Sequence, residues 1–554
     1  MEDENVADFG DGVEHGAGEV DPAKHVAAFL IGIRERFKIP HEACNFVASE
    51  VRDIIELSTS HLTARVISAL QIANVDPAAV NLDDVVNDHS WQNSFDYYSD
   101  ARHLNAFIAE KFDFVEPVEY VLGRGVNGKD RCMQYVSIID TLKALLRKDE
   151  VFAEVLNGHC SQDGLILDFC DGLHCKSNAS LSEHQSLQIQ LYSDDFCVAN
   201  PLGNKVKKLK FSAYYFILGN LSPKFRSKLN MIQLACLCPT EYVKEYGLEN
   251  VLAPLVRDLK SIEVTGIEIE RDGVKHTFTG SLSMIVTDNL AAHSIGGFQE
   301  SFNTLRSCRF CHVTKTEVKT HLRTSPESRR TEMSYNQQAR ICTANPDMAG
   351  IYGIKSCSVF NSLRYFHVVN GLPSDIAHDL FEGVVPVVLE KVILHCVQSG
   401  YFTLEELNNK VECFPYDGSD LVNKPSKMKT DVNQFKVKQT AVQCWCFLRL
   451  FPVMFGSVVP VDDKIWSVLL LLADVVELAT TTKVTSPLCH FMADVTESFL
   501  VSFKKFSKES GATLLPDLYP RTVELNVQKV FGRKHLYQPL IYLSSESIYL
   551  ISKA

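Results

Sequence analysis

The chain has 554 residues, of which 46% are hydrophobic and 22% are charged. Single cores rarely grow past ~250–300 residues, so this length predicts several domains. The composition excludes a wholly disordered chain, a collagen-like chain and a small disulfide-stapled scaffold. The formal net charge of −13 would by itself argue against a nucleic-acid partner.

The negative charge is concentrated at the N-terminus. Residues 1–22 carry eight acidic side chains and no Lys or Arg, which leaves −5 for the other 532 residues. We expect residues 1–24 to form a disordered acidic tail. The acidic start does not resemble a signal peptide, and no apolar run reaches the ~20 residues that a bilayer requires. The 17 cysteines are therefore expected to be reduced thiols of an intracellular protein without membrane contact.

Hydrophobic periodicity predicts helical flanks around a middle of mixed α and β structure. Apolar residues recur at helical spacing in the N-terminal part, and a polar connector over 81–100 separates it from a helix over 136–156. Alternation predicts strands over 187–191, 211–218, 231–237 and 282–286, with a hairpin at Asp272-Gly273. Helices are expected again over 248–262, 384–397, 439–451 and 464–479. The predicted regions are 1–24, 25–80 (helical), 81–180 (connector and helical), 181–385 (mixed core) and 386–554 (helical, with a divergent end).

Two acidic residues stand where predicted strands stop. Asp194 follows one alternating strand and Asp288 follows another. Neighbouring strand ends would bring both carboxylates to one point, where divalent cations bind. Two such cations ~3.5–4 Å apart can clamp the attacking and leaving oxygens of a phosphoryl transfer. Spacing alone does not choose Asp194 over Asp195, and an Asp after a strand is more often a turn former or a helix cap.

A third acid is expected from the segment that begins at Asp375. Asp375, His378, Asp379 and Glu382 follow one another at i, i+3, i+4 and i+7, so an α-helix would place them on one face. Such a face could reach a metal site. The simpler alternative is a solvated helix surface.

Cys308-Arg309-Phe310-Cys311 has the spacing of half a tetrahedral zinc site. The two missing ligands could be histidines. The candidates are His367, His378, His312 and His321. A redox pair is less favoured because no thioredoxin-like context surrounds the motif, and two incidental cysteines remain an alternative.

Two stretches near the candidate acids are basic. Residues 196–240 contain seven basic side chains and no acid, and residues 303–340 contain eight against three acids. Phosphate backbones bind such clusters, although Lys also protects exposed strand edges. The residues expected to contact DNA are Lys205, Lys207, Lys208, Lys210, Lys224, Arg226, Lys228, Arg306 and Arg309.

Four stretches, in this order, resemble signatures of transposases of the CACTA (En/Spm) group, above all the animal copies and the host proteins derived from them. They lie at Leu187–Gly203, Tyr214–Ser227, Val286–Cys311 and Gly371–Val384. The resemblance spans roughly residues 187–385.

The resemblance implies an α/β (α+β) fold with a ribonuclease-H-like mixed sheet, a zinc-binding insertion and helical flanks. It implies a DDE triad that binds Mg²⁺ or Mn²⁺ and falls on Asp194, Asp288 and Glu382, with Asp375 and Asp379 as alternatives for the third acid. It further implies a Zn²⁺ site at Cys308 and Cys311, completed by His378 and His367.

The implied function is metal-dependent cleavage and transfer of DNA strands in the nucleus, with self-association as a further expectation. The alternative is a catalytically inactive, host-domesticated scaffold that binds nucleic acid or protein. The altered segment Leu514–Pro520 and the unmatched residues 523–554 favour that alternative. A zinc-dependent hydrolase is disfavoured because the chain has no His-Glu-x-x-His motif.

Overall fold

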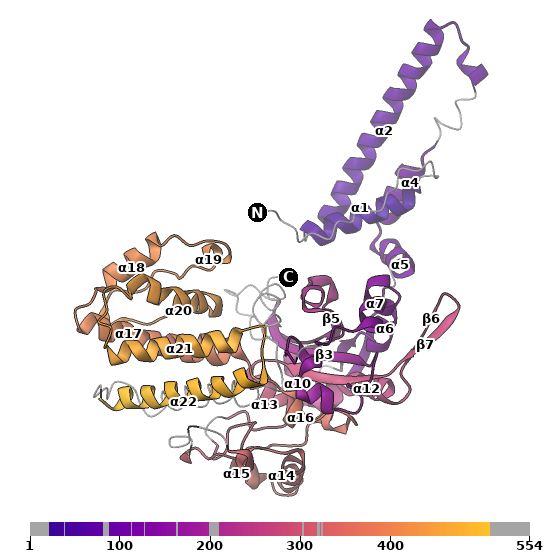
Figure 1. The fold of residues 1–554 in the computed structure, drawn as a ribbon. Coiled ribbons are helices and arrows are strands. Elements are labelled where there is room, and N and C mark those ends of the chain that lie inside the picture. Colours follow the sequence, from indigo (N-terminus) through magenta and orange to yellow (C-terminus); the bar gives the residue numbers. More distant parts are fainter. Residues whose placement is uncertain are drawn as a thin grey trace. The chain divides into compact units, whose positions relative to one another are not determined.

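The computed structural model separates into two units, Met1–Glu116 and Pro117–Ala554 (Figure 1). The predicted acidic tail lies outside the described residues up to position 20, and so does the divergent C-terminal end from position 510. The described ranges are 21–37, 39–80, 88–111, 114–126, 128–161, 164–198, 210–301, 304–317, 322 and 325–509.

The first unit is helical, as its periodicity predicts. Its helices are α1 (Pro22–Phe37), α2 (His41–Ile72), α4 (Ser90–Tyr98) and α5 (Ala101–Lys111). The stretch expected as a connector contains α4, because Phe95 and Tyr98 recur at helical spacing and are buried against Val26 and Leu30 of α1.

The second unit contains a six-stranded mixed sheet in the order β1-β2-β5-β4-β3-β8. Its strands are β1 (Val118–Arg124), β2 (Asp130–Tyr135), β3 (Leu187–Cys197), β4 (Lys210–Leu218), β5 (Gln233–Pro239) and β8 (Gly280–Val286). Neighbouring strands are antiparallel except β3 and β8, which run parallel. The mixed α and β class expected for this region is confirmed.

Alternation along β3 separates two faces of the sheet. Leu187, Ile189 and Leu191 enter the main hydrophobic core, where α6 (Ile138–Leu146) and α12 (Ala253–Val264) also bury residues. The single helix predicted over 136–156 is in fact two, because α6 ends before Arg147-Lys148 and α7 (Asp149–Asn157) begins after them. The strands β6 (Ile267–Arg271) and β7 (Val274–Phe278) form the predicted hairpin, in which Asp272 and Gly273 have φ of 53° and 75°.

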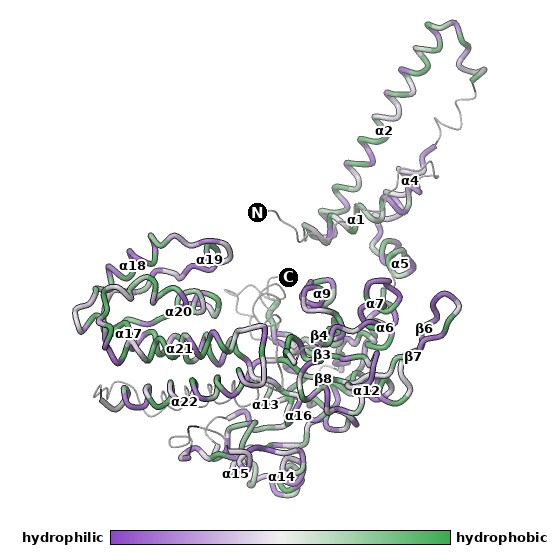
Figure 2. Tube along the Cα trace, in the orientation of Figure 1, coloured by the Kyte–Doolittle hydropathy of each residue, from purple (hydrophilic) through white to green (hydrophobic). Residues whose placement is uncertain are grey.

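The C-terminal part of the second unit is helical and has its own hydrophobic core. Its longer helices are α17 (Val385–Gln398), α18 (Leu404–Cys413), α20 (Ala441–Phe455), α21 (Lys464–Thr480) and α22 (Ser486–Glu509). Apolar residues recur along α20 and α21 (Figure 2). Within the described ranges, every helix is too short or too polar to span a bilayer.

Candidate active site

Asp194 lies in β3, and Asp288 lies two residues past the end of the parallel neighbour β8. Tyr192 of β3 is in register with Val286 of β8, and each acid follows two residues later, so the two acids come at the same level of neighbouring segments. The hydroxyl of Thr287 donates to the carbonyl of Ser193 at 2.9 Å, which joins the segment after β8 to β3. The prediction that a strand stops at Asp194 is wrong, since β3 continues to Cys197.

The structure shows which of the neighbours Asp194 and Asp195 lies on the side of Asp288, a choice that sequence spacing leaves open. Successive side chains of a strand point to opposite faces. Asp195 is exposed and pairs with Lys210 at 3.0 Å, whereas Asp194 is half-buried on the side of Asp288. Asp194 keeps one carboxylate oxygen in place by accepting the backbone N–H of Asp195 at 2.8 Å.

Asp288 is also a helix cap. Its Oδ1 accepts the backbone N–H of Ala291 at 2.7 Å and begins α13 (Asn289–Ile295). The alternative that an Asp after a strand caps a helix therefore holds for Asp288. It does not exclude a metal-binding role, because a carboxylate has a second oxygen and further lone pairs.

The surroundings of Asp194 concentrate negative charge. Burial raises the pKa of its carboxyl, and the neighbouring charge of Asp288 raises it further. Burial also raises the pKa of the Tyr192 phenol, and the charges of Asp194 and Asp375 act in the same direction. The sequence signal for Tyr192 is its position two residues before Asp194, on the same side of the alternating strand.

The third predicted element is a π-helix, η9 (Ala377–Val384), immediately after Asp375. His378 Nδ1 lies 2.5 Å from Asp375 Oδ2, and its Nε2 lies 3.7 Å from Glu382 Oε2. The hydrogen bond to Asp375, supported by the charges of Asp375, Glu382 and Asp288, raises the pKa of His378 to about 9. The imidazole is therefore cationic at neutral pH and bridges two of the candidate third acids.

Asp379 does not share the face expected from α-helical spacing. It is fully buried and its Oδ1 accepts from Asn289 Nδ2 at 2.7 Å. The i→i+5 pattern of a π-helix widens the turn and changes which residues lie above one another. The candidates for the third acid are thereby reduced to Asp375, which is partly buried, and Glu382, which is exposed.

Two of the arginines expected to contact DNA are buried and have structural partners, which corrects that expectation. Arg309 donates to Asn289 Oδ1 at 2.7 Å and to the carbonyl of Pro373 at 2.8 Å. Arg226 forms two 2.6 Å bonds with the buried carboxylate of Asp168. Neither guanidinium can reach a phosphate in this conformation.

The other basic candidates differ in exposure. Arg306 donates to the carbonyls of His312 and Ile351 at 2.9 and 3.1 Å, so it also braces the fold. Lys210, Lys224 and Lys228 are exposed. Lys205, Lys207 and Lys208 lie outside the described residues.

Cys308 and Cys311 are buried next to one another. The hydrogen bond with Cys308, together with burial, raises the pKa of the Cys311 thiol. His367 uses Nδ1 to accept the N–H of Val369 and lies 3.2 Å from Asn336 through Nε2. His378 is engaged by Asp375 and Glu382.

Two further histidines were candidates for the same site. His312 Nε2 lies 3.2 Å from Ser334 Oγ. His321 lies outside the described residues. No described histidine therefore completes a compact ligand set with the two cysteines.

Among the described residues, one set of three His, Cys, Asp or Glu side chains has ligand atoms that all lie within 4.8 Å of each other: Cys160, Cys170 and Asp171. Neither the carboxylate set nor the Cys308–Cys311 pair extends to such a group there. Sequence reasoning missed the Cys160 group, because two cysteines ten residues apart match no familiar ligand spacing.

Comparison of the chain with protein-family models gives no match, and comparison with curated protein sequences gives none either.

Proposed function

We propose that the chain is derived from a DDE-type transposase of the CACTA group, with a ribonuclease-H-like core that cleaves and transfers DNA strands in a metal-dependent reaction in the nucleus. The observation that carries the proposal is the placement of Asp194 in β3 next to Asp288, which follows the end of the parallel neighbour β8. A phosphoryl-transfer site needs carboxylates from separate elements at one point. Glu382 of η9 would supply the third, with Asp375, two residues before η9, as its alternative.

The candidate acids supply the carboxylate oxygens that divalent cations prefer, although Asp194, Asp288 and a third acid do not form a set within 4.8 Å among the described residues. Asp194 is half-buried next to a second carboxylate, and this repulsion is what raises its pKa beyond the effect of burial. Mg²⁺ or Mn²⁺ held by Asp194, Asp288 and the third acid would supply the Lewis acidity that activates water or a 3′-hydroxyl. The chain itself fixes the two aspartates through β3 and the capped start of α13.

His378 and the exposed lysines have their own roles in this proposal. The cationic imidazole holds Asp375 and Glu382 in place at Nδ1 and Nε2. Lys210, Lys224 and Lys228 provide positive charge for the DNA backbone. Cys308 and Cys311 remain a predicted half-site for Zn²⁺, for which the described residues offer no further ligand.

The alternative, an inactive host-domesticated scaffold, is also supported by a specific observation. Among the described residues, the candidate acids do not form a set of three whose ligand atoms all lie within 4.8 Å of one another, and His378 provides a positive charge beside them. A protein of this kind would bind nucleic acid or protein without cleaving a strand.

Nicking of supercoiled plasmid DNA in the presence of Mn²⁺ tests the proposal without a known target sequence. We expect the full-length chain to nick DNA and Asp194→Asn to reduce the rate at least a hundredfold, since even the residues behind metal ligands cost ~10–100-fold. Asp195→Asn is the matched control, because it removes an adjacent exposed carboxylate and should leave the rate unchanged. Equal nicking by the parent chain and Asp194→Asn would refute the active site, and DNA binding without nicking would establish the scaffold.

A further inference from the structure

The segment before β3 brings two cysteines and an aspartate together. Asp171 ends the short helix η2 (Phe169–Asp171) and accepts three backbone N–H groups. Its Oδ2 accepts from Leu167 at 2.9 Å and from Asp168 at 3.1 Å, and its Oδ1 accepts from Ser161 at 2.6 Å. This carboxylate therefore connects Ser161, the neighbour of Cys160, to Leu167 and Asp168 and keeps Cys160 close to Cys170.

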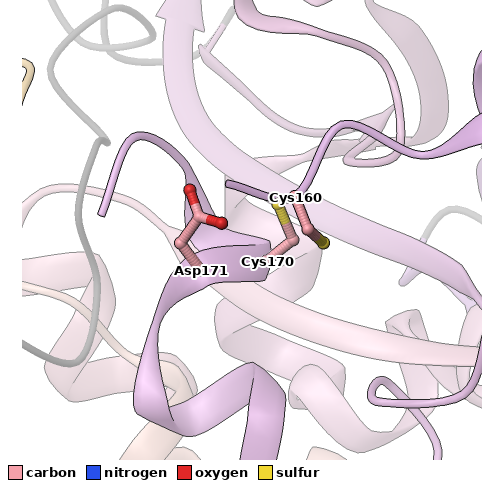
Figure 3. A group of neighbouring side chains, drawn as sticks. All are labelled: Cys160, Cys170 and Asp171. Carbon is pink, nitrogen blue, oxygen red and sulfur yellow. The ribbon is translucent and has the colours of Figure 1, made fainter. Parts of the chain in front are cut away.

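We propose that Cys160, Cys170 and Asp171 form a second metal site, for a thiophilic divalent cation such as Zn²⁺. Their ligand atoms all lie within 4.8 Å of one another, and the two cysteine side chains lie side by side in Figure 3. Zn–S bonds of ~2.3 Å in tetrahedral geometry put two sulfurs about 3.8 Å apart. The two sulfur atoms thus need to approach each other by about 1 Å or less to bind one cation.

The donor set selects the cation. Two thiolates and one carboxylate favour Zn²⁺ and Cd²⁺ over Mg²⁺ and Mn²⁺, which prefer oxygen ligands. Asp171 Oδ1 accepts a hydrogen bond from the Ser161 N–H and has a second lone pair for a cation. Cys170 and Asp171 are buried, whereas Cys160 is exposed, so the cation can enter from solvent and keep a water as its fourth ligand.

The location indicates what the site does. Phe169 and Cys170 pack with Leu181 and with Met284 of β8 in one small hydrophobic cluster. Met284 of β8 is in register with Gln190 of β3, and Asp288 follows the end of β8 four residues after Met284. A bound cation would hold Cys160 against Cys170 and Asp171, next to β8. Because the hydrophobic cluster there is small, this cross-link would stabilise the fold. The proposal is independent of DNA cleavage.

Titration of the reduced full-length chain with Cd²⁺ tests the site through the ultraviolet thiolate-to-cadmium absorption. We expect Cys160→Ser to lose one bound equivalent and the matching absorption. Because Cys160 is exposed, the variant should unfold at the same temperature as the parent chain without metal. Zn²⁺ should raise the unfolding temperature of the parent chain more than that of the variant.

Two control variants separate this site from other thiols. Cys413→Ser removes an exposed cysteine of α18, and Cys308→Ser removes half of the other predicted zinc motif. Both should retain the Cd²⁺ equivalent that Cys160→Ser loses. Equal stoichiometry and absorption in the parent chain and Cys160→Ser would overturn the proposal, as would loss of the same equivalent in Cys413→Ser.

Discussion

Arg226 shows how a residue's neighbours in space can differ from its neighbours in the chain. The surrounding sequence has no acid, which suggests a phosphate contact. In the fold, its guanidinium meets Asp168, which also lies 2.7 Å from His159 Nε2. Burial alone would raise the pKa of Asp168, but the hydrogen bonds from His159 and Arg226 lower it below its usual value. A carboxylate that is charged and buried depends on both partners.

We expect Arg226→Met to destabilise the second unit by about 3–5 kcal/mol, since it leaves a buried charge without its main partner. Urea unfolding measures this loss. Lys224→Met removes an exposed charge nearby and should change stability by no more than about 0.5 kcal/mol. On the proposed function, only Lys224→Met should reduce the salt dependence of DNA binding, by about one unit of slope. A stable Arg226→Met protein with weakened DNA binding would contradict the structural role.

His367 provides a prediction about pH. Burial lowers its pKa from 6.5 to about 4. In the unfolded chain this imidazole binds a proton near pH 6.5, whereas in the folded chain it stays neutral until about pH 4. Acidification between these values therefore favours unfolding. The contribution of neutral His367 to the free energy of unfolding is fully present above pH 6.5. It falls by about 3 kcal/mol by pH 4, at 1.36 kcal/mol per pKa unit.

Urea unfolding at several pH values checks this linkage. His367→Gln should flatten the dependence between pH 6.5 and 4. His312, whose pKa burial also lowers to about 4, keeps its own part of the slope in that variant. An unchanged slope in His367→Gln would contradict the neutral buried state.

At the scale of elements, α13 links stability to the proposed chemistry, because Asp288 both caps the helix and belongs to the candidate triad. Asp288→Ala should cost about 1 kcal/mol through the lost cap, whereas Asp288→Ser keeps a capping hydroxyl and should cost only a few tenths. Both variants should lose Mn²⁺-dependent nicking. Thermal unfolding and the nicking assay measure the two effects separately, and a Ser variant that still nicks DNA would exclude Asp288 from the triad.

The predictability of each element follows from how its residues are buried. Alternation in Leu187, Ile189 and Leu191 predicts β3 because one face of that strand enters the core. The strands β1 and β2 escape prediction because β1 is largely exposed and shows no clear alternation of burial. The π-helical form of η9 has no signal in the periodicity, so the burial of Asp379 could not be foreseen.

The candidate site was predictable only in part, for a related reason. Asp194 and Asp288 follow strands that the pattern identifies, and parallel pairing brings them together. Which histidine or arginine contacts which partner depends on tertiary packing between segments far apart in sequence, as Arg309 and Pro373 show. The Cys160 group depends on hydrogen bonds from backbone N–H groups to the Asp171 carboxylate, which leave no trace in residue spacing.

For the whole molecule, net charge and local charge predict opposite partners. The total of −13 includes eight acids within residues 1–22, while the second unit exposes Lys210, Lys224 and Lys228. Acidic residues tethered to a basic surface raise the local concentration of competing anions. DNA therefore stays compatible with a chain whose total charge is strongly negative.

On the proposed function, deletion of residues 1–22 should tighten non-specific binding to duplex DNA, because the net charge changes from −13 to −5. The gain should be largest at low salt and shrink as the Debye length falls to ~10 Å at 0.1 M. Fluorescence anisotropy with a random duplex measures it. A full-length variant with all eight acids changed to Asn or Gln separates charge from length, and it should bind as the truncated chain does. Equal low-salt affinities for the parent chain and both variants would show that the acidic residues do not compete with DNA.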